Sequence, residues 1–257
     1  MIRAMSIRFR ILIAMFIIAV AFPLVHASPL QLDVRALALG ETYAGDLASN
    51  FVLNPSSLTS NNMTQLNLNY YSVPHLDLVS NTVSLKYRLL GIANSRLMVT
   101  DVAGENYVDN KMSISYGKEL LKDLIFGLGY RLEYINWGES NKQNQGLTFS
   151  IVKQGPRMNL GMVISDLLLS RNSMDIRCGL NLRFNSSSLL NVELDNDKNY
   201  YIGYEHSLMN NLKVRLGTNS SSYSLGCGIE SELLNFDYAY VMNDLSYLHR
   251  MGITVVF

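Results

Sequence analysis

Hydrophobic and polar residues alternate with a period of two along most of the chain after Leu66. The stretch Leu124–Ile135 reads LIFGLGYRLEYI, and every second residue from Leu124 to Tyr134 is apolar or aromatic. The stretches 82–89 (TVSLKYRL) and 175–184 (DIRCGLNLRF) follow the same rule. Successive side chains of a β-strand point to opposite faces, so this pattern predicts strands with one apolar and one polar face.

Fourteen such segments follow one another, centred near residues 69, 86, 98, 114, 129, 150, 161, 179, 191, 203, 215, 226, 237 and 252. Most have the length of a tilted strand that crosses a bilayer, which needs about 9–11 residues. The segment near residue 98 alternates poorly, and its register stays open. An even number of strands is typical of bacterial single-chain barrels. We therefore expect an all-β fold, a transmembrane antiparallel β-barrel of about 14 strands.

The connections between these segments favour the same architecture. They are short after even-numbered segments, and we expect longer loops after several odd-numbered ones, at residues 72–81, 103–110, 136–145 and 166–173. Short turns on one side and longer loops on the other are typical of outer-membrane barrels. Later connections are short on both sides, so the asymmetry is partial.

Most charges of the strands fall on the polar face of the alternation. A charge on the lipid face near mid-bilayer costs about 2–4 kcal/mol, so we expect these side chains to face the lumen. The set comprises Lys86, Arg88, Arg131, Glu133, Arg177, Arg183, Glu193, Lys213, Arg215 and Asp237.

A soluble β-sandwich or solenoid would explain any single strand equally well, with the apolar face as its core. It explains less well the persistence of the pattern, or the tyrosines at the ends of apolar rows, which are typical of an interfacial girdle. The composition also favours the membrane, because charged residues are only 16% of the chain, below the roughly 25% of soluble domains. The tyrosines in question are Tyr70, Tyr134, Tyr200, Tyr240 and Tyr247.

The first 27 residues have the layout of a secretory signal peptide. Basic residues up to Arg10 precede an apolar run from Ile11 to Val25, and Val25-His26-Ala27 is a small-residue cleavage site. A retained anchor is the alternative, but the 15-residue run is short for a spanning helix, which needs about 20 residues. Cleavage removes three arginines and leaves 18 basic and 21 acidic residues, a net charge of −3, which predicts no nucleic-acid partner.

The segment 28–64 lacks the strand period. Small residues dominate its first part, and Asn54-Pro55 marks a turn. Fourteen strands enclose more room than their own side chains fill. We therefore expect residues 28–64 to form a plug inside a barrel of residues 65–257, with a periplasmic tail as the alternative.

Both ends of the chain resemble the PorV/PorQ branch of FadL-like outer-membrane proteins. Arg35, Gly40, Asp46, Asn54 and Pro55 stand in the order of the branch's N-terminal signature. The doubled glycine, second aspartate, tryptophan and Ala-Gly of that signature are missing. The C-terminal S-x-x-H-R-x-G-I-x-x-x-F, from Ser246 to Phe257, is similar to the last strand of the family. The resemblance covers the two ends only.

The resemblance implies a barrel in the bacterial outer membrane that serves as a component or partner in protein secretion and surface attachment. A FadL-like transporter of hydrophobic small molecules is the alternative, and a structural or adhesive barrel is a third hypothesis. The expected partners are outer-membrane lipid, the outer-membrane assembly machinery, and either secretion-system proteins or a hydrophobic small molecule. Phe257 resembles the terminal signal that the assembly machinery reads. Leu167, Leu168 and Leu169, in an expected outer loop, either receive an apolar ligand or pack over the barrel mouth.

No constellation in the sequence indicates an enzyme, a metal site or a cofactor. The histidines do not stand at metal-ligand spacing. Ser246 and His249 are three residues apart and so point to opposite faces of a strand. The pairs Gly127/Gly129 and Gly226/Gly228 precede no helix and more plausibly leave lumen space for a plug. Cys178 and Cys227 either pair in an oxidising compartment or act as small apolar residues.

Overall fold

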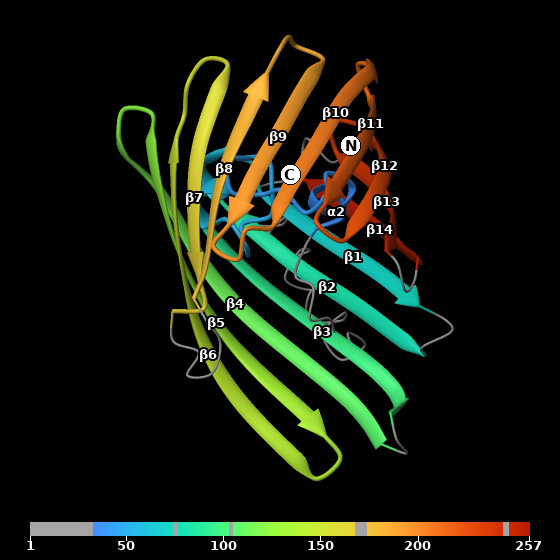
Figure 1. Ribbon diagram of the computed structural model, residues 1–257. Coiled ribbons are helices and arrows are strands. Elements are labelled where there is room, and N and C mark those ends of the chain that lie inside the picture. Colours follow the sequence, from blue (N-terminus) through green and yellow to red (C-terminus); the bar gives the residue numbers. More distant parts are fainter. Residues whose placement is uncertain (1–32, 74–76, 103–104, 168–173, 244–246) are drawn as a thin grey trace.

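The computed structural model describes residues 33–73, 77–102, 105–167, 174–243 and 247–257. Its fourteen strands close into one barrel, in which every strand pairs antiparallel with its neighbours in the sequence and β1 pairs with β14 (Figure 1). This confirms the predicted barrel. The predicted signal peptide lies outside the described residues.

The strands are β1 (Gln65–Val73), β2 (Leu78–Tyr87), β3 (Leu90–Val102), β4 (Glu105–Leu121), β5 (Leu124–Trp137), β6 (Ser140–Lys153), β7 (Met158–Ser165), β8 (Asp175–Arg183), β9 (Ser188–Asp195), β10 (Tyr200–Met209), β11 (Leu212–Asn219), β12 (Ser222–Glu230), β13 (Leu234–Asn243) and β14 (Tyr247–Val256). The first strand begins and the last strand ends at the same end of the barrel, since Gln65 pairs with Val256. We call this the turn end and the opposite one the loop end.

The loop end differs from the expectation in one respect. Residues 72–81, 103–110 and 136–145, which we expected to be loops, lie largely in strands. β4 has 17 residues and β7 has 8, and the β5–β6 ladder continues to the pair Trp137–Ser140. The β6–β7 ladder, by contrast, covers only Phe149–Lys153. The long hairpins of β4, β5 and β6 therefore extend beyond their neighbours, at the bottom of Figure 1.

The apolar face of the alternation points outward. Nearly every strand contributes large exposed hydrophobic side chains, and most of the inward positions are polar. This is the reverse of a soluble sandwich, whose apolar face would be its core, and so large an apolar surface marks a contact with lipid or protein. Cys178 and Cys227 are free and stand in outward rows. Examples of the exposed set are Tyr70, Ile92, Ile114, Leu128, Ile151, Leu160, Leu194, Ile202, Leu216, Leu225, Met242 and Met251.

Residues 33–64, which we call the plug segment, lie inside the barrel (blue in Figure 1). Helix α2 (Val34–Ala38) begins at the N-cap Asp33 and contacts β11–β14. The 3₁₀ helix η3 (Pro55–Thr59) begins at the N-cap Asn54 and contacts β4–β6. In the described parts of the chain, no helix is long and apolar enough to cross a membrane.

The apolar core lies between the plug segment and the wall. One cluster joins α2 and Tyr43 to Val163, Ala239 and Val241 on the wall. Smaller clusters join Phe51 and Leu58 to β3, and Leu47 to β5 and β6. The plug segment is therefore part of the folded core, and burying these side chains contributes about 1.5–3 kcal/mol for each large one.

Candidate functional site: the plugged lumen

Glycines on the inner wall make room for the plug segment. A Cβ atom on Gly161 would stand 1.9 Å from the carbonyl oxygen of Ala44, and one on Gly217 would stand 2.0 Å from the nitrogen of Gly40. These contacts are to backbone atoms, which cannot move aside as a flexible side chain can. Similar contacts with the plug segment occur at Gly91, Gly117, Gly127, Gly179, Gly203, Gly226 and Gly252. We call these nine glycines the glycine ring; it includes Gly127 and Gly226, which we expected to leave space for a plug.

Inward side chains of the wall also bind the backbone of the plug segment. Glu193 accepts a hydrogen bond of 2.6 Å from the backbone nitrogen of Ala44. The hydroxyl of Ser150 accepts one of 2.9 Å from the nitrogen of Ser56 and lies 2.8 Å from the hydroxyl of the same serine. The plug segment does not join the β-ladder of the wall, so its buried backbone groups need other hydrogen-bond partners. These side chains of the wall supply them.

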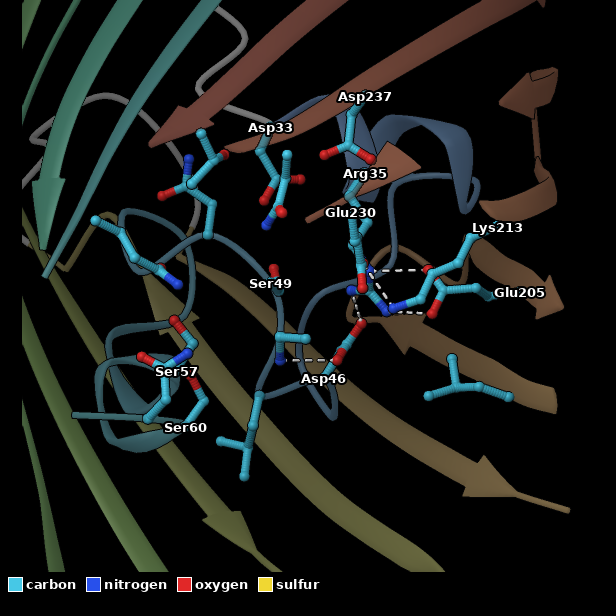
Figure 2. A pocket seen from close by; sticks show the side chains of 18 of the residues that line it. Asp33, Arg35, Asp46, Ser49, Ser57, Ser60, Glu205, Lys213, Glu230 and Asp237 are labelled. Atoms are coloured by element: carbon cyan, nitrogen blue, oxygen red, sulfur yellow. Dashed lines mark hydrogen bonds and ion pairs between the residues drawn. The ribbon is translucent and has the colours of Figure 1, made fainter. Parts of the chain in front are cut away.

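Arg35 is the centre of a buried ionic network between plug segment and wall. Its guanidinium pairs with Asp46 of the plug segment, and its Nε donates to Glu205 of β10 at 3.0 Å (Figure 2). Glu205 also accepts a hydrogen bond of 2.7 Å from Arg215 on β11, which in turn pairs with Asp237 on β13. These five residues join α2 to three strands. Because every member is buried or half-buried and paired, the network holds α2 at one position.

The other residues of the N-terminal signature fix the path of the plug segment. Gly40 has φ of 68°, and a Cβ there would meet backbone atoms of β10 and β11 at 2.6 Å. Asn54 caps η3, and its amide donates to the carbonyl oxygens of Tyr43 and Ala44 at 2.9 and 3.2 Å. Pro55 follows in the first turn of η3, where its missing N–H costs nothing. The five signature residues therefore shape and anchor the plug segment.

Arg177 of β8 makes a further anchor, at the side of the plug segment that faces the loop end. Its guanidinium lies 4.4 Å from the ring centre of Tyr43 and 3.7 Å from that of Tyr201. It also donates to the carbonyl oxygen of Glu41 at 2.8 Å. A cation–π contact that is shielded from water contributes about 2 kcal/mol to stability, more than an exposed one.

Burial acts on the ionisable groups of the plug segment. It raises the pKa of Asp33 to about 6, although the backbone N–H of Ala36 and the charge of Arg35 work in the opposite direction. For Arg35, burial would lower the pKa, but Asp46 and Glu205 hold it above its usual range. Arg35 is therefore a permanent cation, whereas Asp33 changes charge between acidic and neutral pH.

A cavity of about 710 Å³ lies between the plug segment and the turn end of the wall. Its lining is mostly serine, asparagine, glutamine and charged side chains. In Figure 2, Ser57 and Ser60 of the plug segment stand on one side, and Lys213 and Glu205 of the wall on the other. The cavity is thus a polar chamber between the plug segment and the turn end.

Of the predicted lumen charges, most face inward. Lys86, Glu133, Arg177 and Arg215 are buried. Arg131 pairs with Asp166, Lys213 pairs with Glu230 at 2.6 Å, and Arg183 lines the cavity.

The prediction for Arg88 was wrong. It lies in the β2–β3 turn with φ of 54° and is exposed, with its guanidinium 5.5 Å from the ring centre of Tyr87. β2 ends at Tyr87, and Arg88 stands in the turn that follows it. Side chains in a turn do not alternate between two faces, so the strand pattern does not apply to Arg88.

The remaining predicted positions lie outside this site. Leu167 is exposed after β7, and Leu168 and Leu169 fall outside the described residues. Phe257 follows β14, and its backbone nitrogen donates to the carbonyl oxygen of Thr64 at 2.9 Å. His249 stands on the outer face, where its Nδ1 lies 2.6 Å from the hydroxyl of Tyr238. Among the described residues, no group of His, Cys, Asp and Glu has the arrangement of a metal site.

Two residues of the site were not among the predicted site residues. Glu205 stands on the polar face of β10 and was not singled out, although it binds both Arg35 and Arg215. Arg250, buried on β14 with its guanidinium 5.0 Å from the ring centre of Tyr71, was noticed only as part of the terminal motif. Both residues stand at inward positions of their strands, and the alternation of polar and apolar residues is the sequence feature that indicates such positions.

Several solved structures have the same fold as this chain. No family model and no curated protein matches the chain. The toluene transporter TodX of Pseudomonas putida matches with a TM-score of 0.64 at 12% identity, over 90% of this chain and 98% of that one. The CymD monoaromatic hydrocarbon channel gives 0.63 at 11%, over 88% and 96%. A FadL homologue of Pseudomonas aeruginosa gives 0.56 at 10%, over 91% and 99%. The chain therefore has a FadL-like barrel fold, and these identities support the fold alone.

Proposed function

We propose that the protein is an outer-membrane barrel that carries hydrophobic small molecules into the cell envelope. The observation that carries the proposal is a FadL-like barrel whose outer face is apolar and whose lumen holds a plug. TodX and CymD are described as carriers of toluene and monoaromatic hydrocarbons, respectively. A molecule of that class partitions into membranes and needs a protein path past the polar outer surface.

An apolar strip on the inner wall near the loop end supports this proposal. Val241 pairs with Leu248 across β13 and β14, Val73 pairs with Leu78 across β1 and β2, and Leu78 pairs with Val99 on β3. All five stand in the inward rows of adjacent strands. We call them the apolar inner strip. A hydrophobic solute can make its first contact inside the barrel with this strip. The polar turn end offers no comparable surface.

Because the plug segment fills the middle of the barrel, passage requires it to move. The test is uptake of labelled toluene by vesicles that contain the purified protein and have an outer leaflet of lipopolysaccharide, which supplies the polar outer surface. Leu78→Asp, in the strip, should lower the initial rate severalfold, whereas Ser207→Asp, near the turn end, should leave it unchanged. Deletion of residues 28–64 in a barrel that still folds should raise permeability. Uptake no faster than that of protein-free vesicles would overturn the proposal.

The remaining sequence expectations belong to the same proposal. Residues 1–27 are a signal peptide, residues 28–64 a plug and residues 65–257 the barrel, which the outer-membrane assembly machinery inserts with the help of Phe257. Phe257→Ser should lower the amount of heat-modifiable barrel in outer-membrane fractions, and unchanged assembly would contradict this role. The secretion and surface-attachment role implied by the PorV/PorQ resemblance has no support among the structural neighbours.

A further inference from the structure

Not every cation around the turn-end cavity is paired with a carboxylate. Every carboxylate that lines the cavity has a partner among the described residues: Asp46 and Glu205 bind Arg35, Asp237 binds Arg215, Glu230 binds Lys213, and Asp33 accepts the N–H of Ala36. Two lining cations, Lys86 and Arg183, have no carboxylate partner in the described parts of the chain. The positive charges of Lys86 and Arg183 are therefore not directly paired, although the lining as a whole contains five carboxylates and four cations.

Lys86 is the more informative of these two cations. It is on the inner face of β2, is only 5% exposed, and its ammonium has one described hydrogen bond, of 3.2 Å, to the hydroxyl of Ser60. An ammonium carries three donors, and burying a charge without a counter-charge is costly. An anion in the cavity would supply the missing counter-charge.

The neighbours of Lys86 are neutral and polar. Gln65 stands directly opposite Lys86 on β1, and Asn67 stands opposite Ser84. Asn67 and the buried Asn69 line the same cavity, and within them the buried atoms Oδ1 of Asn67 and Nδ2 of Asn69 have no hydrogen-bond partner in the structure. Buried amide groups nearly always have such a partner. The row Gln65, Asn67 and Asn69 therefore presents amides to whatever occupies the cavity.

We infer that the turn-end cavity binds a small hydrophilic anion, a carboxylate or phosphate carried by a polyhydroxylated molecule. The anionic group contacts Lys86, and the hydroxyls contact the amide row of β1 and the serines of η3. The inference goes beyond the proposed hydrocarbon transport, since a lining of this polarity offers nothing to a hydrocarbon. It stands whether or not the barrel carries toluene.

Equilibrium dialysis of the purified, folded full-length chain tests the inference. The probes are labelled gluconate, inorganic phosphate, and sorbitol, which resembles gluconate but carries no charge. We expect saturable binding of gluconate or phosphate, and the tighter of the two identifies the anionic group. Sorbitol should bind about tenfold more weakly than gluconate, as expected for loss of a charge-assisted contact.

Variants of Lys86 connect binding to the site. Lys86→Gln should weaken binding about tenfold, Lys86→Arg should restore most of it, and Lys153→Gln, at an exposed lysine near the same end, should change nothing. If Lys86→Gln does not fold, acylation of Lys86 in the unaltered protein, followed by mass spectrometry with and without gluconate or phosphate, gives a second reading. Absence of saturable binding of both anions, equal binding by Lys86→Gln, or failure of the anion that binds to protect Lys86 would each overturn the inference.

Discussion

The two helical turns of the plug segment are held in different ways. Around η3 the contact is neutral: Gly117 and Gly127 meet Pro55 and Ser56, and Ser150 supplies the hydrogen bonds. Around α2 the glycine ring continues, but the ionic network centred on Arg35 is added. The η3 contact therefore depends on shape, and the α2 contact depends on both shape and charge. The comparison teaches that one barrel can hold the two sides of its plug by different physical means, so that a change of charge should affect one side and a change of shape the other.

Arg35→Met should have the largest effect on this comparison. Removing one member of a buried ion pair typically costs about 3–5 kcal/mol, and Asp46 would keep only neutral partners. Hydrogen exchange measured by mass spectrometry should show faster exchange of the amides around α2 and little change around η3. As a control, Lys213→Met breaks a partly exposed pair and should cost less than about 1 kcal/mol. Equal acceleration around both helices would contradict the separation of the two contacts.

Gly127→Ala should produce the converse result. Its Cβ would stand 2.3 Å from the nitrogen of Ser56 and 2.5 Å from the carbonyl carbon of Pro55, and overpacking of this kind costs about 1–3 kcal/mol. Exchange should accelerate around η3 and not around α2. Gly146→Ala is the matched control, because its Cβ would approach only side-chain atoms, at 3.3–3.6 Å. The glycine ring has no steric role if the two variants behave alike.

Ser150→Ala should have a smaller effect on the same side. It removes the hydroxyl that accepts from Ser56, but Asn54 also accepts from that nitrogen at 3.2 Å. We expect a loss of about 1 kcal/mol in the protection of η3 amides. Thr82→Val, which removes a hydroxyl that lies 3.1 Å from Ser95 on the wall, should leave η3 unchanged. No change in η3 protection in Ser150→Ala would show that shape alone holds this helix.

The remaining prediction concerns pH. The pKa of Asp33 is raised from 3.8 to about 6, so the docked plug binds more protons than the released plug between these values. Docking therefore weakens as pH rises from about 4 to about 6. Asp33→Asn keeps an N-cap side chain for α2 and should remove this part of the pH dependence. Protection of α2 amides that rises with pH in this window would contradict the assignment.

The alternation predicted the number, order and facing of the strands because it reports which side of each strand avoids lipid. It could not predict where the strands end. The polar run Asn141–Gln145 has the composition of a loop, but it pairs with Leu132–Asn136 of β5 and so remains in the ladder. Strand length at the loop end depends on the partner strand, and a local pattern does not contain that information.

The site was predictable in its parts but not in its pairing. Arg35 and Asp46 were singled out through the family resemblance, and Arg215 through its inward position. Glu205, the common partner of Arg35 and Arg215, lies 170 residues from Arg35 in the sequence, and nothing in a single sequence connects residues so far apart. The cavity next to Lys86 depends in the same way on how the plug segment lies across the wall.

The seam between β1 and β14 has a consequence for how the chain reaches its native state. Gln65 of β1 pairs with Val256 of β14. This ladder joins the two ends of the barrel sequence, and we expect it to form last. The plug segment comes before β1, yet it docks on strands that follow much later, from β3 to β14. Contacts between residues so distant in sequence are slow to form, because loop-closure entropy opposes them. Enclosure of the plug and closure of the seam are therefore expected in one late, rate-limiting step, after the hairpins from β2 to β13 have formed.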